Sequence, residues 1–396
     1  MENRPSIKPY IIIGALAIII VGAVIWYFSG QTFQIVKKAG APITGTETGF
    51  PTGAVTGTAP SGEETDGGGE LAGTQEPKLA QLTDFSVVSP TLNKTEDKIY
   101  FYAKSGGDIY ESDFSGKEKK KISNITILGI LEAQWSPKKD KALVWYLDKN
   151  EVKKFIQTIS TTTQAAFLPQ AAYSAAWSLD GNSIAYLAPD KNETNLVIAD
   201  SSVRNPKIRF KTPVSDFRIS WIGQNQISFN SASSGFAPSV LYIYDLKSAL
   251  FSKIIDNIYG FTSLWSPDGK QLLYSATNSS GGGLSLYLKE IGGKASKLNL
   301  ATLPEKCVWS SDSKEIFCAV PQNPSSGPMP DEYYQGLTYF SDSFTRIKPE
   351  TGEITEILSE GNFDAQNLTI TANKQKLFFV NRKDGILWGI NLATSN

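Results

Sequence analysis

The 396-residue sequence predicts an all-β fold, a seven-bladed β-propeller of four-stranded antiparallel blades. The first observation is a repeat, because five tryptophans with similar surroundings follow one another at intervals of 42, 44, 44 and 44 residues. A period in the low forties, with about four short strands per unit, is typical of propeller blades. The second observation is that short turns and apolar or alternating segments follow each tryptophan. The tryptophans are Trp135, Trp177, Trp221, Trp265 and Trp309.

The unit around Trp265 shows how each strand of a blade is recognised. Strand A, the innermost, ends at this tryptophan, and Asp268-Gly269 supplies the positive φ angles of a tight hairpin turn. The apolar run 272–274 predicts strand B. In the preceding unit, residues 241–246 alternate between two faces and predict strand C. A short polar strand D completes the blade on the outside.

Two weaker copies of the pattern, centred near residues 88 and 370, bring the number of blades to seven. The last blade ends after its strand C, at residues 386–392, which would leave an open sheet edge. Residues 78–83 have the pattern of the missing strand D. We therefore expect this strand to pair with the C-terminal blade and close the ring, and the propeller domain to cover residues 78–396.

A family resemblance rests on the Trp-Ser-Pro-Asp-Gly-Lys sequence at 265–270 and the apolar strand that follows it to Tyr274. This segment resembles the WD40-like (PD40-type) repeats of TolB-like propellers, and the resemblance covers about residues 78–396. It implies an extracytoplasmic binding propeller. TolB has a separate N-terminal α/β domain, and related peptidases have a hydrolase domain. Neither has a counterpart here, so the resemblance implies none of their partners or activities.

The residues before the propeller predict a membrane anchor. Residues 11–28 carry no charge and have aromatic residues at both ends, so we expect a transmembrane helix over 10–28 after a short cytoplasmic tail, 1–9. A cleaved signal peptide is the alternative, although no small-residue cleavage site follows closely. Residues 29–77 are rich in glycine, threonine and acidic residues and predict a flexible linker. Because such a linker is typical of an extracellular stalk, we expect a single-pass protein of the cell membrane with an extracytoplasmic propeller.

The composition excludes several classes of function. The chain has no histidine, which excludes histidine-dependent nucleophiles, histidine zinc ligands and an imidazole base. A net charge of -1 argues against a nucleic-acid partner. No nucleotide-binding glycine motif is present, and only Asp84, Glu132 and Asp364 come near the carboxylate cluster that a calcium site needs. We expect no cofactor, no metal and no catalysis, and a partner that is an envelope or cell-surface protein or a glycan.

The loops supply the first candidate binding residues. B–C and D–A connections emerge on one face of a propeller, and the B–C loops of blades 4, 5 and 6 are long, whereas the A–B turns are short. Long loops on a rigid scaffold concentrate binding residues. Their aromatic and methionine side chains either contact a partner or fold inward over their own blade, and the sequence leaves both arrangements open. The candidates are Phe236, Met329, Tyr333, Tyr334, Tyr339 and Phe340.

The channel mouth supplies a second set of candidate binding residues. Glu132, Arg218 and Lys306 each lie three residues before a tryptophan and are expected near the channel mouth on the loop-bearing face. They would orient a polar ligand there, or they are solvated charges around a water-filled pore. The alternative function is a carbohydrate-active hydrolase or lyase, in which Glu132 with Asp84 or Asp364 would supply the two carboxylates that glycoside cleavage needs.

The two cysteines flank the A–B turn of blade 6. If Trp309 lies opposite Ile316, then Cys307 lies opposite Cys318. Opposed residues of neighbouring strands have Cα atoms ~4.5–5.5 Å apart, which is within reach of a disulfide. The sequence is compatible with a disulfide and with two small buried thiols.

Overall fold

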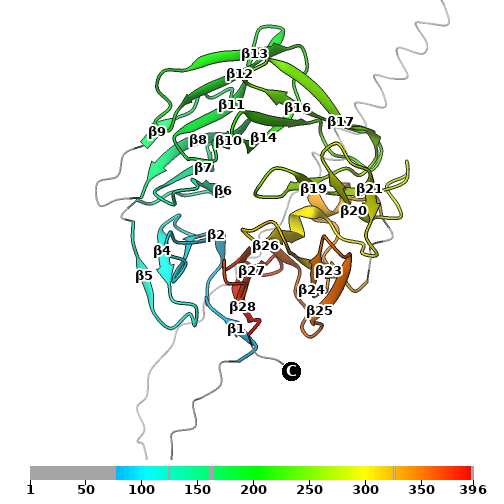
Figure 1. Cartoon of the computed structure of the whole chain (residues 1–396). Coiled ribbons are helices and arrows are strands. Elements are labelled where there is room, and N and C mark those ends of the chain that lie inside the picture. Colours follow the sequence, from blue (N-terminus) through cyan, green and yellow to red (C-terminus); the bar gives the residue numbers. More distant parts are fainter. Residues whose placement is uncertain (1–76, 124, 160–164, 324, 326, 394–396) are drawn as a thin grey trace, which may run out of the picture. The chain divides into compact units, whose positions relative to one another are not determined.

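The computed structural model describes residues 77–393 except 124, 160–164, 324 and 326. These residues form seven four-stranded antiparallel sheets arranged around a centre (Figure 1), which confirms the seven-bladed propeller. The tail, the transmembrane helix expected at 10–28 and the linker lie outside the described residues. In the described part of the chain, no helix is long and apolar enough to cross a membrane.

Each blade has its strands in the order A to D from the centre outward, as seen for β6 to β9 and β10 to β13 in Figure 1. Blades 1 and 2 are β2 (Val87–Leu92), β3 (Ile99–Ala103), β4 (Ile109–Ser112), β5 (Lys119–Lys121), β6 (Ile130–Trp135), β7 (Lys141–Asp148), β8 (Glu151–Thr158) and β9 (Ala165–Phe167). Blades 3 and 4 are β10 (Ser174–Trp177), β11 (Ser183–Asp190), β12 (Glu193–Asp200), β13 (Lys207–Thr212), β14 (Arg218–Gly223), β15 (Gln226–Asn230), β16 (Ser239–Asp245) and β17 (Leu250–Ile258).

The remaining blades carry the two short helical segments. Blade 5 is β18 (Ser263–Trp265), β19 (Gln271–Ala276), β20 (Ser285–Glu290) and β21 (Ala295–Lys297). The 3₁₀ turn η1 (Pro304–Lys306) leads into blade 6, which is β22 (Cys307–Trp309), β23 (Ile316–Pro321), β24 (Asp342–Lys348) and β25 (Glu353–Leu358), with α2 (Asp331–Tyr334) in its B–C loop. Blade 7 is β26 (Ala365–Ile370), β27 (Lys376–Asn381), β28 (Leu387–Asn391) and β1 (Leu79–Gln81).

Blade 7 joins both ends of the described chain. The strand β1 pairs antiparallel with β28 and is the outermost strand of this sheet. The Leu82 amide extends the pairing by donating to the Leu387 carbonyl at 2.8 Å, and the Leu82 side chain is buried in a core cluster shared with blade 1. The last sheet edge is therefore covered by a segment from the start of the domain, which removes a site for mispairing.

The repeated tryptophans join neighbouring blades. The indole N–H of Trp135 donates to the Ser89 carbonyl of blade 1 at 2.7 Å. Trp177 donates to the carbonyl of Gln134 in blade 2 at 2.9 Å, a bond of the same kind. The core clusters also span two blades each, as expected for units that bury their faces only against neighbours. These tryptophans are thus structural.

The propeller has two faces with different connections. We call the side of the A–B and C–D connections the turn face, and the side of the B–C and D–A connections the loop face. On the turn face, Asp268 accepts hydrogen bonds from the Ser266 hydroxyl at 2.6 Å and the Lys270 amide at 3.1 Å, which fixes the tight A–B turn. Asp180 and Asp312 make the corresponding bonds in blades 3 and 6. The repeated Ser-x-Asp sequence is explained by these turns.

Candidate functional site

Three B–C loops of the loop face are joined into one surface. We define the three-loop platform as residues 231–238 of blade 4, 277–284 of blade 5 and 327–340 of blade 6. The Asp331 carboxylate, at the start of α2, accepts from the Gly235 amide at 2.6 Å and from the Ser234 hydroxyl at 2.8 Å. The Met329 amide donates to the Gly281 carbonyl at 2.9 Å. Loops from three different blades thus fix one another.

Glycines make this close packing possible. A Cβ atom at Gly235 would lie 2.5 Å from the Gly281 Cα and 2.7 Å from the Met329 carbonyl oxygen. Gly281 has φ +79°, and a Cβ there would lie 2.6 Å from the Pro328 Cβ. Any larger side chain would push the loops apart, so these two positions require glycine.

The underside of the platform is a small hydrophobic cluster. Met329, Tyr333 and Phe340 are 2%, 4% and 3% exposed and pack with the buried Leu303. We therefore correct their assignment as partner-contacting residues. Their side chains face inward because the loop folds over its own blade, and a partner reaches them only if the loop opens.

The upper side of the platform carries exposed apolar side chains. Phe236, Tyr334 and Tyr339, which the sequence suggested as binding residues, are 62%, 54% and 56% exposed. Leu337 is 69% exposed and was missed by sequence reasoning, although it lies in the same loop. The structure thus separates the aromatic residues of the blade 6 loop into a buried set and an exposed set.

A buried ion network lies under α2. Lys306 is completely buried, and its ammonium lies 2.6 Å from Asp364 Oδ1, 2.9 Å from Asp342 Oδ2 and 2.8 Å from the Ala365 carbonyl oxygen. Three acceptors match the three protons of the ammonium. Burial raises the pKa of Asp342, and Lys306 opposes this shift. The rings of Tyr333 and Phe340 lie over the ammonium, each with its centroid 5.3 Å away.

The position of Lys306 requires a correction, because the sequence suggested that it lies at the open channel mouth. The blade 6 loop covers it, so it binds no external ligand in this conformation. Asp364, the suggested partner of Glu132 in catalysis, is also fully buried and is held by Lys306. Lys306 and Asp364, which the sequence assigned to the channel, thus form an ion pair beneath the platform and stabilise it.

Arg382, which sequence reasoning missed, holds the blade 6 loop from blade 7. Its guanidinium donates to the carbonyls of Tyr333 at 2.6 Å and Thr338 at 3.1 Å. It lies 4.1 Å from the centre of the Tyr333 ring and 3.6 Å from Asp364 Oδ2. No spacing rule marks this residue in the sequence, because its partners come from a loop of another blade.

Glu132 and Arg218 differ from Lys306 although they occupy the same place in their blades. They lie on the inner strands β6 and β14, and both are exposed. Partial loss of hydration raises the pKa of Glu132, while a hydrogen bond with Gln134 opposes the shift. Asp84 is exposed as well. Within the described ranges, no group of three or more His, Cys, Asp or Glu side chains is arranged to hold a metal ion.

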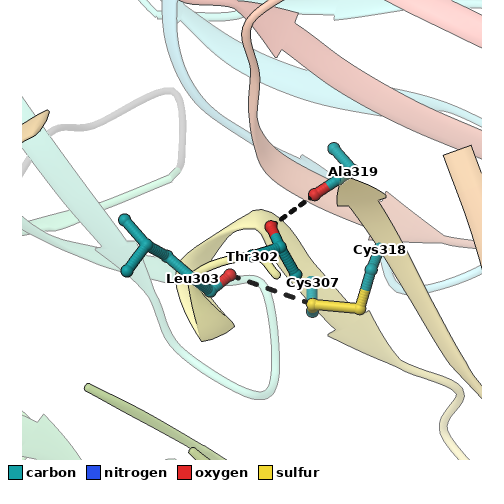
Figure 2. The surroundings of a disulfide bond; sticks show 5 residues. All are labelled: Thr302, Leu303, Cys307, Cys318 and Ala319. Carbon is teal, nitrogen blue, oxygen red and sulfur yellow. Dashed lines mark hydrogen bonds between the residues drawn. A yellow bond between two sulfur atoms is a disulfide. The ribbon is translucent and has the colours of Figure 1, made fainter. Parts of the chain in front are cut away.

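Figure 2 shows the disulfide between Cys307 and Cys318 on β22 and β23. The register places Cys307 opposite Cys318 and Trp309 opposite Ile316, as the sequence indicated. The Cys307 sulfur lies 3.9 Å from the carbonyl oxygen of Leu303, a member of the cluster beneath the platform. The disulfide thus ties the start of blade 6 to the strand that leads into the platform.

Comparison with known proteins shows the fold alone. Scans against protein-family models and curated protein sequences find no match. Oligogalacturonate lyase from Vibrio parahaemolyticus is similar with a TM-score of 0.59 and 9% identity, over 79% of this chain and 93% of that chain. The propeller domain of the Trilobed protease from Pyrococcus furiosus has a TM-score of 0.54 and 12% identity, over 78% of this chain and 98% of that chain.

A TolB from Acinetobacter baumannii matches over 78% of this chain and 64% of that chain, with 14% identity and a TM-score of 0.38. Proteins of one fold carry many unrelated functions, so a function does not follow from such similarity. With the repeats described above, the similarity to the protease propeller supports the β-propeller fold.

Proposed function

We propose that this protein is a non-catalytic binding module that captures an envelope or cell-surface protein through the three-loop platform. In this proposal a helix at 10–28 anchors the chain in the cell membrane and the propeller lies on the extracytoplasmic side. The observation that carries the proposal is the platform itself, in which three loops are fixed to one another and present Phe236, Tyr334 and Tyr339 to solvent.

Further apolar side chains on the same face support a protein partner. Protein interfaces have a core of aromatic and aliphatic anchors that is depleted in charge. Aromatic side chains on a fixed backbone lose little conformational entropy on binding. The exposed residues in or beside the D–A and B–C connections also include Leu128, Leu131, Leu147, Val214 and Leu337. This face therefore offers several anchors to a partner wider than one loop.

An enzyme that cleaves an acidic oligosaccharide is the second candidate. The likeness in fold to an oligogalacturonate lyase favours it, and so does Glu132, since a general acid works with a raised pKa. If this candidate is correct, oligogalacturonate is cleaved by the full-length protein and Glu132→Gln abolishes the cleavage. Absence of any product from oligogalacturonate removes the support that the likeness gives to this candidate.

Site-specific photocrosslinking in native membranes tests the binding module. A photoreactive residue is placed at 236 or 334 on the platform, and in matched variants at 270 or 314 on the turn face. We expect discrete protein adducts from the platform positions, which weaken strongly when Tyr339 and Leu337 are both replaced by Ser. Adducts from the turn-face positions alone, or none from the platform, would contradict the proposal.

A further inference from the structure

We propose that the turn face carries a binding site for a neutral sugar ring, in a pocket between the inner strands of blades 4 and 5. The pocket has a volume of about 260 Å³. It is lined by residues 220–222 of β14, residues 263–267 of β18 and the turn that follows it, and Leu179 of the blade 3 A–B turn. The three-loop platform lies on the other face, so this inference is independent of the proposed function.

Two serines of blade 4 provide the space. Ser220 on β14 lies opposite Ser228 on β15, so both side chains are on the same face of the sheet. This face points towards blade 5, because the indole N–H of Trp265 donates to the Ser228 hydroxyl at 3.1 Å. In blade 5 the equivalent pair is Leu264 and Leu273, which pack against blade 6. The serines thus leave a gap where the next blade has two leucines.

The gap exposes part of the Trp265 ring. Trp309, which packs with the leucine pair, is 5% exposed, whereas Trp265 is only partly buried. The hydrogen bond of Trp265 also differs, because Trp135 and Trp177 donate to carbonyls on the inner strand of the preceding blade. Trp265 reaches past this strand to β15, and Ser220 on the inner strand remains exposed. The indole N–H therefore holds the two blades together, and the ring forms a wall of the pocket.

The other walls supply hydrogen-bonding groups and no charge. Ser220 is exposed, and the Ser263 hydroxyl accepts from the Asn230 amide at 2.7 Å, which leaves its own proton for a ligand. Trp221, the second indole in the wall, has a buried N–H without an acceptor among the described residues. None of the described residues that line the pocket is charged. The pocket thus combines aromatic rings with a few polar groups, as small-molecule sites do.

A neutral sugar ring matches this chemistry. Its C–H face is apolar and packs on an indole, and its hydroxyl groups exchange hydrogen bonds with serine hydroxyls. An apolar side chain of a protein would instead leave the serine hydroxyls without partners, which is unfavourable. An acidic sugar or a phosphate would lose its hydration without meeting a cation. Since the volume is below the ~300–1,000 Å³ of pockets for drug-sized ligands, the pocket holds one ring of an oligosaccharide.

Binding to an array of oligosaccharides tests the inference. The full-length protein, in a detergent without a sugar headgroup, is applied to neutral oligosaccharides of glucose, galactose, mannose and N-acetylglucosamine. We expect retention on at least one of them, and an excess of oligogalacturonate should not compete, because the pocket has no cation for its carboxylates. Calorimetric titration with the retained oligosaccharide then gives the Kd of the wild type and of each variant.

Ser220→Leu is the decisive variant, because it gives blade 4 the side chain that blade 5 has at this position and fills the pocket. It should weaken binding of the neutral oligosaccharide at least tenfold. Ser311→Leu, at an exposed serine on the A–B turn of blade 6, is the matched control and should leave the Kd unchanged. Retention on no neutral oligosaccharide, equal binding by Ser220→Leu and the wild type, or equal loss in both variants overturns the inference. Photocrosslinking from the platform should be unchanged by Ser220→Leu, so the two proposals fail separately.

Discussion

Blade 6 and blades 2 and 4 place a charged residue at the same position, but in different environments. Lys306 is completely buried and bound by two carboxylates, whereas Glu132 and Arg218 are exposed. The repeat fixes where a residue lies in its blade. The inserted loop of blade 6 decides whether that place faces solvent or the protein interior.

Different residues hold the blade 6 loop in place and are available to bind a partner. The ion network of Lys306 and the contacts of Arg382 hold the blade 6 loop from below and from blade 7. The exposed side of the same loop is then available for binding at a small entropic cost, because its backbone is already fixed. Substitutions of the supporting residues should therefore lower the stability of the protein. Substitutions on the exposed side of the loop should weaken capture of a partner and leave the stability almost unchanged.

The largest difference is expected between Lys306→Met and Arg218→Met. Removal of Lys306 leaves Asp342 and Asp364 buried without their shared cation, which costs about 3–5 kcal/mol of the free energy of unfolding. Arg218 is exposed, and its replacement should change stability by less than about 0.5 kcal/mol. Denaturant unfolding of both variants measures this. Similar, small effects would show that the buried network contributes nothing to the support.

Neighbouring tyrosines of α2 provide the next comparison. Tyr333→Ala removes a buried ring from the cluster and should cost about 3 kcal/mol, whereas Tyr334→Ala removes a half-exposed ring and its hydrogen bond with Glu305 and should cost about 1 kcal/mol. Only Tyr334→Ala is expected to weaken photocrosslinking from position 236 in a protein whose melting temperature is only slightly lowered. If Tyr333→Ala leaves thermal unfolding unchanged, the inward packing of this loop is wrong.

The disulfide is the third test of the support. It closes a loop with a sequence separation of 11 residues, so its loss should lower stability by about 2.5 kcal/mol through the unfolded state. Unfolding of the wild type with and without reductant is compared with that of the Cys307→Ala, Cys318→Ala double variant. The reductant should destabilise only the wild type. Equal curves for all four samples would show that the cross-link is not formed in the protein.

The smallest expected effect concerns pH. A hydrogen bond from Lys374 lowers the pKa of Asp312, and one from Ser178 lowers that of Asp180, so both ionised carboxylates stabilise the folded state. Their contribution is complete above about pH 4, the pKa range of unfolded Asp, and is lost as the pH falls further. The raised pKa of Asp342 acts in the opposite direction, since ionisation disfavours the folded state as the pH rises. Asp312→Asn should therefore flatten the acid side of the stability profile, and an unchanged profile would contradict this assignment.

The strands and turns were predictable from the sequence because each depends on local residues. Seven blades follow from the repeat, and the cross-strand position of Cys307 and Cys318 follows from counting along one hairpin. The two sides of α2 were not predictable, because Tyr333 and Tyr334 are identical neighbours. Their burial depends on Asp331 meeting Gly235, which is 96 residues away in the sequence, and on Arg382 of another blade.

Amide hydrogen exchange of Asp331→Ala tests most directly whether the three loops form one platform. This substitution removes the bonds to Ser234 and Gly235 and leaves the strands of each blade unchanged. Our account predicts faster exchange in 231–238 and 277–284 as well as in 327–340, with Asp331→Asn intermediate. Faster exchange confined to 327–340 would contradict it, because the loops would then be independent and the platform would not exist as a unit.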